Sequence, residues 1–210
     1  MDDYFVEIKK LYLIIKDDIQ SKINIFKQIG CAGNDKDIFA ELVFCLLTPQ
    51  SRAKSCWKAV ENLIKKDLLF NGDKKQIAKE LFGVRFQNNK SGYIIEARKK
   101  YIEVLKFLKK DIDVYIRREW LVRNIKGFGY KESSHFLRNI GLGKNITILD
   151  RHILKNLKLL KVIDEIPKVL SKKKYLETEE KIKIFSKNIN IPLNHLDLVL
   201  WYKEAGEIFK

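Results

Sequence analysis

Two side chains of opposite charge stand at positions where they could carry out chemistry together. Lys131 comes two residues after the turn Gly127-Phe128-Gly129, and Asp150 follows an apolar run nineteen residues later. If Lys131 lies in the first turn of a helix and partly inside a cleft, the helix dipole and burial both lower its pKa. An amine with a lowered pKa is a nucleophile at neutral pH and can form a Schiff base. The alternative is a solvated surface lysine in a lysine-rich chain.

Asp150 stands where a helix is expected to begin, because Ile153, Leu154 and Leu157 follow it at helical spacing. An aspartate in this position commonly caps the helix by accepting hydrogen bonds from its first N–H groups. A capping carboxylate at the edge of a cleft can also take a proton from a lysine or stabilise a developing positive charge. Asp150 and Lys131 are therefore the candidate catalytic pair.

The turn before Lys131 is predicted to connect two helices tightly. Gly127 and Gly129 can adopt backbone angles closed to other residues, and they leave their N–H groups uncovered. N–H groups at a helix N-terminus bind phosphate, and Phe128 is expected to fill the space between the two helices. The pattern predicts a helix-hairpin-helix that holds a nucleic-acid backbone without reading its sequence. An ordinary helical hairpin is the alternative.

The composition favours a polyanionic partner. The 210 residues include 42 Lys and Arg against 27 Asp and Glu, a formal net charge of +15, and 46% of them are hydrophobic. A globular protein with this excess is attracted to nucleic acid or to an anionic membrane surface. A generally lysine-rich chain is the simpler explanation, but the hairpin supports nucleic acid.

The spacing of apolar residues predicts helices almost throughout, and thus an all-α fold. Helices are expected over residues 4–28 and 36–47, among others. Thr48 and Pro49 are expected to begin the next helix, as its cap and its first residue. Residues 85–93 are interpreted as a loop. Strand-like alternation does not extend beyond four positions, so no sheet is predicted.

Several other classes of protein are disfavoured. No segment approaches the roughly 18 apolar residues of a transmembrane helix, and the acidic N-terminal sequence lacks the apolar core of a signal peptide. Cys31, Cys45 and Cys56 have a spacing that suits neither zinc nor an iron–sulfur cluster. They are interpreted as buried, reduced thiols. A cytoplasmic protein with no metal and no cofactor is expected.

The segments around Lys131 and Asp150 together resemble a known family. The run IKGFGYKESSHFLRNIG and the later DRHIL are similar to the helix-hairpin-helix DNA glycosylase/AP lyases, in particular the type 2 archaeal and bacterial 8-oxoguanine DNA glycosylases. The similarity extends over the chain, including DEIPK and LDLVLWY. The segment LTPQSRAKSCW departs from the family pattern, which affects strand opening and contacts with the opposite base.

The resemblance implies an all-α fold of two helical domains, with the active site in the cleft between them. Residues 30–142 are expected to form a helical barrel domain that contains the helix-hairpin-helix, at about 118–141. Residues 1–29 and 143–210 are expected to form the second domain and complete the cleft.

The resemblance also implies the chemistry. Lys131 would attack C1′ of the damaged nucleotide and expel the base, with Asp150 activating it and stabilising the cationic sugar. β-Elimination from the Schiff base would then cut the strand 3′ to the lesion. His152 would contact a phosphate, as Gly127 and Gly129 would. The implied partner is double-stranded DNA containing 8-oxoguanine. The protein is expected to bind it as a monomer and to have no membrane partner.

The base pocket is expected to draw on the C-terminal part of the chain and on Phe86. Asp197 is the candidate acceptor for the N1–H and N2–H donors of the base, and Trp201 the platform on which the base stacks. Phe86 is expected to cover its other face. Lys210 would close one wall after Gly206 ends the last helix. The alternative for both aromatic residues is core packing.

Three other functions stay open on the sequence alone. A helix-hairpin-helix module could hold DNA without catalysis, in which case Lys131 would be incidental. A glycosylase for another oxidised base is possible, although endonuclease III-like enzymes often carry four cysteines after the catalytic aspartate, and this chain has no cysteine beyond Cys56. A membrane-surface protein is the least favoured, because no helix combines a basic face with a strongly apolar one.

Overall fold

The computed structural model describes residues 3–31 and 34–210 of the chain. Within these ranges it contains eleven α-helices and no β-strand, so the predicted all-α fold is confirmed. The helices are α1 (Asp3–Cys31), α2 (Asp35–Leu47), α3 (Ala53–Lys65), α4 (Leu68–Asn71), α5 (Lys74–Glu80), α6 (Gln87–Leu108), α7 (Val114–Asn124), α8 (Tyr130–Asn139), α9 (Arg151–Leu159), α10 (Lys172–Asn188) and α11 (Leu193–Ala205).

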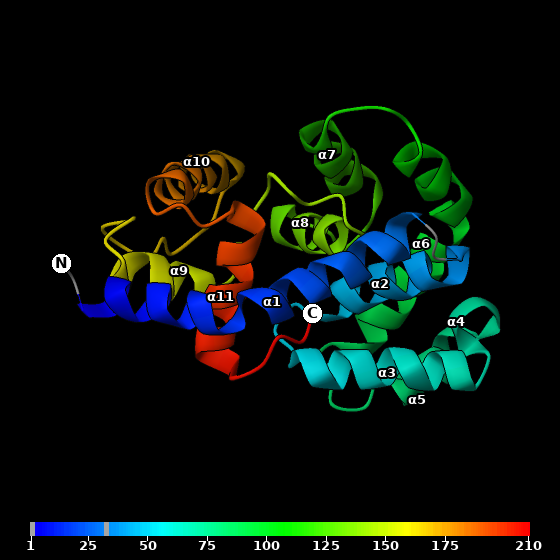
Figure 1. Ribbon diagram of the computed structural model, residues 1–210. Helices are drawn as coiled ribbons and strands as arrows, with labels where there is room; N and C mark the ends of the chain where they lie inside the picture. Colours follow the sequence, from blue (N-terminus) through cyan, green and yellow to red (C-terminus); the bar gives the residue numbers. More distant parts are fainter. Residues whose placement is uncertain (1–2, 32–33) are drawn as a thin grey trace.

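The buried apolar side chains form two clusters, which lie on opposite sides of the view in Figure 1. The first draws on residues 38–146, and the second on residues 8–26 and 149–200. The exact domain boundaries, near residues 30 and 142, stay a prediction, although the clusters divide the chain near these points. The chain therefore crosses between the clusters directly before the helix that Asp150 begins.

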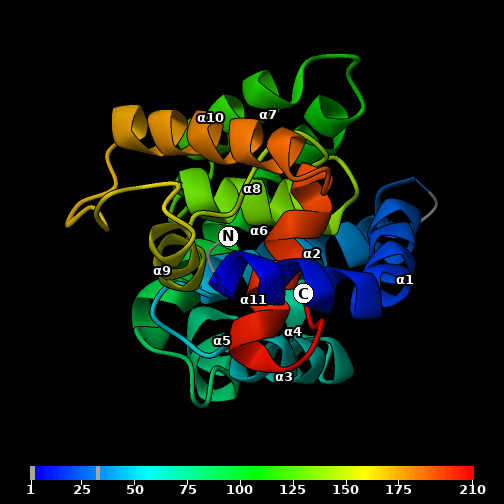
Figure 2. The ribbon, with the colours of Figure 1, turned by 60° about the vertical axis from the view of Figure 1, so that its left-hand side comes forward.

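The second cluster brings the N-terminal helix against the C-terminal part of the chain. α1 packs across α11, and α9 and α10 also contact α11 (Figure 2). Ile8, Ile15, Ile19 and Ile23 follow one face of α1 at helical spacing and are buried in this cluster. This stripe is the apolar face that the sequence predicted for the first helix.

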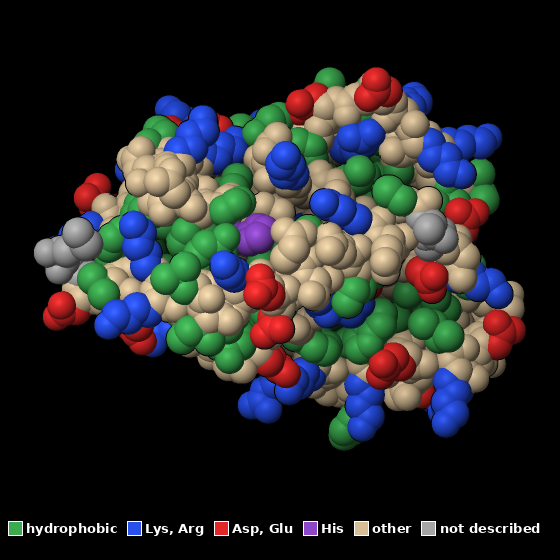
Figure 3. Space-filling view, viewed as in Figure 1, with side chains coloured by type: hydrophobic (Ala, Val, Ile, Leu, Met, Phe, Trp, Pro, Cys, Tyr) green, Lys and Arg blue, Asp and Glu red, His purple; other side chains and the backbone are tan. Residues whose placement is uncertain are grey.

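The surface carries its positive charge in a dispersed form. On the face shown in Figure 3, Lys and Arg side chains are spread over most elements and are interleaved with Asp and Glu. Among the described residues, no helix is long and apolar enough to cross a membrane.

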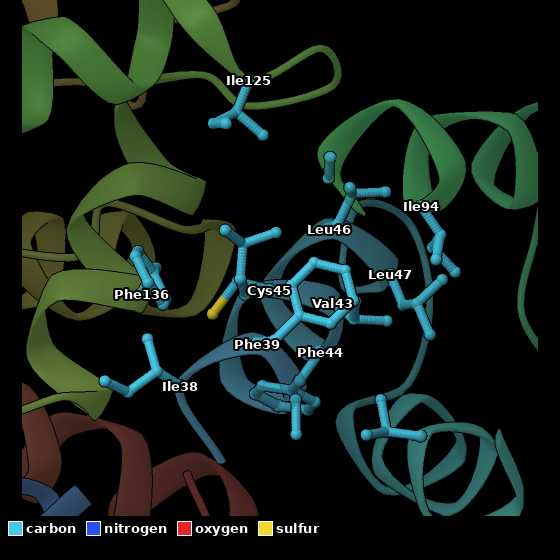
Figure 4. Close-up of a cluster of buried hydrophobic side chains, with 14 of the residues drawn as sticks. Ile38, Phe39, Val43, Phe44, Cys45, Leu46, Leu47, Ile94, Ile125 and Phe136 are labelled. Atoms are coloured by element: carbon cyan, nitrogen blue, oxygen red, sulfur yellow. The ribbon is translucent and has the colours of Figure 1, made fainter. Parts of the chain in front are cut away.

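α2 lies at the centre of the first cluster. Every residue from Ile38 to Leu47 is buried, which is typical of a helix surrounded by other elements. Figure 4 shows Ile94 of α6 and Phe136 of α8 facing α2 from two sides. α2 therefore fixes the position of α8, the helix that carries Lys131.

The helix-hairpin-helix expected at residues 118–141 is formed by α7, α8 and the turn between them. Phe128 in this turn is 7% exposed, and its ring meets that of Phe136 edge to face, with 6.1 Å between centroids. The expectation that Phe128 fills the space beneath the hairpin is confirmed.

A buried ion pair connects the hairpin to the second cluster. The guanidinium of Arg118 on α7 donates two hydrogen bonds to the carboxylate of Glu179 on α10, at 2.6 and 2.8 Å. The N–H of Thr147 also donates to Glu179 at 3.0 Å. Both charged side chains are 1% exposed, so the carboxylate holds together three separate parts of the chain.

Three local predictions are wrong. Thr48 is the C-terminal cap of α2, and Arg52 precedes α3, so Thr48 and Pro49 lie in the turn between the two helices. Most of residues 85–93 is helical, because α6 begins at Gln87. Cys31 is exposed at the end of α1, whereas the other two thiols are buried as expected.

Candidate active site

Lys131 and Asp150 line the same cavity, which has a volume of about 1040 Å³. Its walls come from the turn after α2, one face of α8, the first turn of α9, α11 and the C-terminal tail. The cavity thus brings together residues from both hydrophobic clusters. Its predicted members are Lys131, Asp150, His152, Asp197, Trp201 and Lys210.

Lys131 lies in the first turn of α8, and its side chain is 21% exposed. Its Nζ donates a hydrogen bond to Thr48 Oγ1 at 2.9 Å. The Thr48 hydroxyl in turn donates to the carbonyl of Cys45 at 2.8 Å, so its lone pairs face the lysine. Glu132 Oε1 is 3.7 Å from the same Nζ. The amine therefore has a fixed place at the cavity wall.

Asp150 caps α9, as predicted. Its Oδ1 accepts hydrogen bonds from the N–H groups of His152 and Ile153, at 2.8 and 2.9 Å. Both bonds use the same oxygen, which leaves Oδ2 available to other partners. The cap fixes the direction of this carboxylate at the rim of the cavity, where a neighbouring cation or amine can reach it.

Only one of the two glycine positions in the hairpin requires glycine. Gly127 has φ +90°, and a Cβ built on it would lie 2.8 Å from the Tyr93 ring, so this position requires glycine. Gly129 has φ −108°, which other residues adopt, and its N–H donates to Glu132 Oε2 at 3.1 Å. The expectations that Gly129 needs a special conformation and has an uncovered N–H are therefore wrong.

Asp197 is 4% exposed and faces a second buried charge. Its Oδ2 lies 3.6 Å from Arg138 Nη1, and its Oδ1 accepts from the N–H of Ile148 at 3.4 Å. Burial raises the pKa of Asp197 to about 6, with Asp150 acting in the same direction and Arg138 in the opposite one. The carboxylate is therefore ionised at pH 7 but poorly satisfied.

Trp201 and His152 stand next to each other in the wall formed by α9 and α11. Their rings meet edge to face, with centroids 5.4 Å apart and planes at 85°. Nδ1 of His152 is 3.5 Å from Glu204 Oε2, and the His152 side chain is 32% exposed. The indole N–H of Trp201 is buried without a hydrogen-bond partner. A buried donor of this kind is available to a ligand.

The C-terminal tail folds back onto the body of the protein. Gly206 ends α11 with φ +73°, as the sequence predicted. The Nζ of Lys210 pairs with the carboxylate of Glu41 on α2 and lies 3.2 Å from the centroid of the Trp57 ring. Asn139 on α8 donates to the other oxygen of Glu41 at 2.9 Å. Glu41 and Trp57 thus hold the Lys210 amine in place, and Lys210 closes one side of the cavity.

Phe86 lies outside the cavity, contrary to the prediction. It precedes α6 with φ +60°, its side chain is 52% exposed, and the guanidinium of Arg85 lies over its ring at 5.5 Å. The residue of this segment that lines the cavity is Arg85. Phe209 of the tail supplies the second aromatic wall instead.

The sequence interpretation missed two buried residues on α8. His135 and Arg138 follow Lys131 at intervals of four and seven residues, so all three share one helical face and line the cavity. Burial, Arg138 and Lys131 together lower the pKa of His135 well below its usual value, which keeps its ring neutral. This spacing was visible in the sequence.

Among the described residues, no group of three or more His, Cys, Asp or Glu side chains is arranged to hold a metal ion. The charged side chains that line the cavity include three lysines (Lys54, Lys131 and Lys210), the buried pair of Arg138 and Asp197, and the capping carboxylate of Asp150.

An all-helical fold in which a lysine after a helical hairpin and a capping aspartate line one cavity is the arrangement of the helix-hairpin-helix DNA glycosylases. A profile of the 8-oxoguanine DNA glycosylase family matches residues 19–191. An 8-oxoguanine DNA glycosylase/AP lyase from Fusobacterium nucleatum is 50% identical over 214 aligned positions, which cover 100% of this chain and 99% of that protein. The chain belongs to the 8-oxoguanine DNA glycosylase family.

Solved structures agree with this assignment. The crystal structure of the 8-oxoguanine DNA glycosylase of Thermotoga maritima superposes with a TM-score of 0.91 at 33% identity, covering 100% of both chains. The Methanocaldococcus jannaschii 8-oxoguanine glycosylase/lyase, solved in complex with a 15mer DNA containing 8-oxoguanine, gives a TM-score of 0.86 at 35% identity. It covers 98% of this chain and 100% of that one.

Proposed function

We propose that this protein excises 8-oxoguanine from double-stranded DNA and then cuts the strand 3′ to the abasic site. The observation that carries the proposal is the common cavity of Lys131 and Asp150, in a chain of this family. The protein acts as a monomer in the cytoplasm, and its two helical domains, residues 30–142 and residues 1–29 with 143–210, enclose the cleft.

Lys131 is the nucleophile. Its amine attacks C1′ of the damaged nucleotide, and the bond from C1′ to the base breaks, so the base leaves with the electron pair. The C1′–O4′ bond then breaks, O4′ takes up a proton that the amine has lost, and C1′ and Nζ form the Schiff base. Loss of a proton from C2′ of this Schiff base then expels the 3′ phosphate. The hydrogen bond from Nζ to Thr48 Oγ1 supports this role, because it holds the amine at the cavity wall.

Asp150 serves as the electrostatic partner and proton acceptor. One oxygen is engaged in capping α9, so the other is left for the cationic sugar or the lysine proton. His152 and the hairpin at Gly127 and Gly129 position phosphates on either side of the flipped nucleotide. At Gly129 the N–H is shared with Glu132, so Gly127 and the following helix N-terminus carry most of this contact.

The extruded base enters the cavity between α11 and the tail. The Asp197 carboxylate accepts hydrogen bonds from the N1–H and N2–H groups of the base. These bonds supply the partners that the carboxylate lacks, because Arg138 Nη1 is 3.6 Å from its Oδ2. The base stacks on Trp201. Lys210, held by Glu41, closes the pocket on the side of α2.

The test is a panel of duplexes, each with one 8-oxoguanine, one unmodified guanine or one oxidised pyrimidine, incubated with and without borohydride. The proposal expects base release, strand cleavage and a covalent protein–DNA product with 8-oxoguanine alone. Binding without a covalent product would show a non-catalytic module. Preferential cleavage at the oxidised pyrimidine would assign the protein to another lesion.

A further inference from the structure

A buried lysine outside the catalytic pair, Lys90, donates hydrogen bonds to the turn after α2, and Thr48 of this turn contacts Lys131. Lys90 lies in the first turn of α6 and is 4% exposed. Its Nζ donates to the carbonyl oxygens of Leu47 and Pro49, each at 2.7 Å, and to Ser51 Oγ at 3.2 Å. The three oxygens match the three donors of an ammonium group, which is costly to bury without partners.

The two carbonyls belong to the residues on either side of Thr48. Cys56 Sγ also donates to the carbonyl of Leu47, at 3.2 Å. The carbonyl directly before Thr48 and the carbonyl of the residue directly after it are therefore fixed from outside the turn, and its hydroxyl is fixed by the bond to Cys45. The remaining contact of that hydroxyl is with Lys131 Nζ at 2.9 Å.

Lys90 is charged where it acts. Burial lowers its pKa to about 8, with Lys131 and Arg85 acting in the same direction, whereas Cys56 and Glu132 oppose the change. At pH 7 most molecules therefore carry the ammonium form, which can donate to all three oxygens at once.

We propose that Lys90 is a positioning residue for the reaction: it fixes Thr48, and Thr48 holds the Lys131 amine where it can attack the sugar. The inference rests on the proposed function. A displacement of about 1 Å at the reacting group can lower a rate by about a hundredfold. The contact of Lys131 with Glu132, at 3.7 Å, is longer than a hydrogen bond and cannot replace that with Thr48.

The competing explanation is that Lys90 only satisfies carbonyl groups at the end of α2. The chain provides a matched control for it. Arg98, on the same helix, donates to the carbonyls of Leu68, Leu69 and Gly72 at 3.0 to 3.2 Å. None of these residues lines the cavity. Arg98 thus also binds backbone carbonyls with a cationic side chain, but the residues it binds do not contact Lys131.

The experiment measures borohydride trapping on DNA with a preformed abasic site, at saturating protein and in a single turnover. Lys90→Met is expected to slow trapping by about tenfold to a hundredfold, with the dissociation constant for DNA unchanged. Arg98→Met is expected to have a trapping rate within about twofold of the wild-type rate, even if its melting temperature falls as much as that of Lys90→Met. Thr48→Val should slow trapping too, and the double variant with Lys90→Met should be no slower than the worse single variant.

Equal trapping rates for Lys90→Met and Arg98→Met, per folded molecule, would overturn the inference and leave the proposed function standing. If Lys90→Met does not fold, Lys90→Gln and Arg98→Gln replace the pair, since the amide of Gln keeps donors in the site, and equal rates there have the same meaning. A wild-type protein that traps no abasic DNA would overturn the proposed function and this inference together.

Discussion

Asp150 has two tasks that a single substitution can separate. Asn is as good a helix cap as Asp, so Asp150→Asn should keep the hydrogen bonds to His152 and Ile153 while it removes the charge. We expect a melting temperature close to that of the wild type and base release slower by about a hundredfold or more, on the scale of general acid–base catalysis. Calorimetry and a single-turnover excision assay check the two parts. A variant that is less stable but turns over normally would leave Asp150 with the capping role alone.

Asp197 predicts a pH dependence that distinguishes base recognition from lyase chemistry. Its pKa of about 6 lies above the unfolded value of 3.8, so its contribution to stability is largest below pH 4 and is lost as the pH rises through 6. Base recognition needs the ionised form, so excision of 8-oxoguanine should rise over the same interval.

The control is cleavage of a preformed abasic site, which uses no base contact and should lack the step at about pH 6. Asp197→Asn should excise slowly at every pH and also lack the step. An excision profile without that step in the wild type would remove Asp197 from the base pocket.

Residue types and spacing were sufficient to predict that Lys131 and Asp150 stand at helix starts, and the structure brings both to one cavity. They were not sufficient for Phe86 or Lys90. Phe86 itself adopts a left-handed backbone conformation and is exposed, and no pattern of apolar residues reveals this. Lys90 is buried by contacts with a turn more than forty positions away along the chain. The long-range hydrogen-bond partners of polar residues are the part of the site that could not be predicted from sequence patterns.

Among the structural elements, the hairpin between α7 and α8 depends on one glycine more than on the other. Gly127→Ala places a Cβ against Tyr93 at a positive φ, whereas in Gly129→Ala the Cβ meets only the flexible end of Glu132, at 3.2 Å. Gly127→Ala should cost roughly 1 kcal/mol or more of folding stability and weaken DNA binding. The loss should be the same for damaged and undamaged duplexes, since the hairpin contacts the backbone.

Titration of both alanine variants against a duplex with and without 8-oxoguanine checks this prediction. Gly129→Ala serves as the control and should bind nearly as well as the wild type. If the Gly127 variant lost only its preference for the lesion, the hairpin would be reading the base, and its assignment to the phosphate backbone would be wrong.

The helical pattern predicted most elements, with errors where a helix ends. The turn after α2 was expected to belong to the next helix, because Thr and Pro often begin helices. In the structure, Lys90 holds the carbonyls of that turn, so tertiary contacts keep it out of α3. Helix ends depend on such partners, whereas the apolar stripe of α1 is a local property and was predictable.

For the whole molecule, we expect fewer phosphate contacts than the net charge of +15 would allow. On the face shown in Figure 3, Lys and Arg are dispersed. Many of these side chains in the protein pair with carboxylates, as Lys66 does with Glu80 and Lys203 with Glu7. If about five phosphates are neutralised, the logarithm of the binding constant should fall with the logarithm of salt concentration with a slope of roughly −4 to −5. Binding measured from low to moderate salt checks this value. A slope beyond about −9 would require about ten phosphates and thus a much larger interface than the hairpin and the cavity rim.

The central claim is that Lys131 attacks the sugar, and the covalent product tests it most directly. The wild-type protein is incubated with an 8-oxoguanine duplex and borohydride, the product is digested with protease and nuclease, and the modified peptide is sequenced by mass spectrometry. The account predicts a reduced sugar remnant on Nζ of Lys131, and no product from Lys131→Gln, which should still bind the duplex. A remnant on Lys90 or Lys210, or trapping by Lys131→Gln at the wild-type rate, would contradict it.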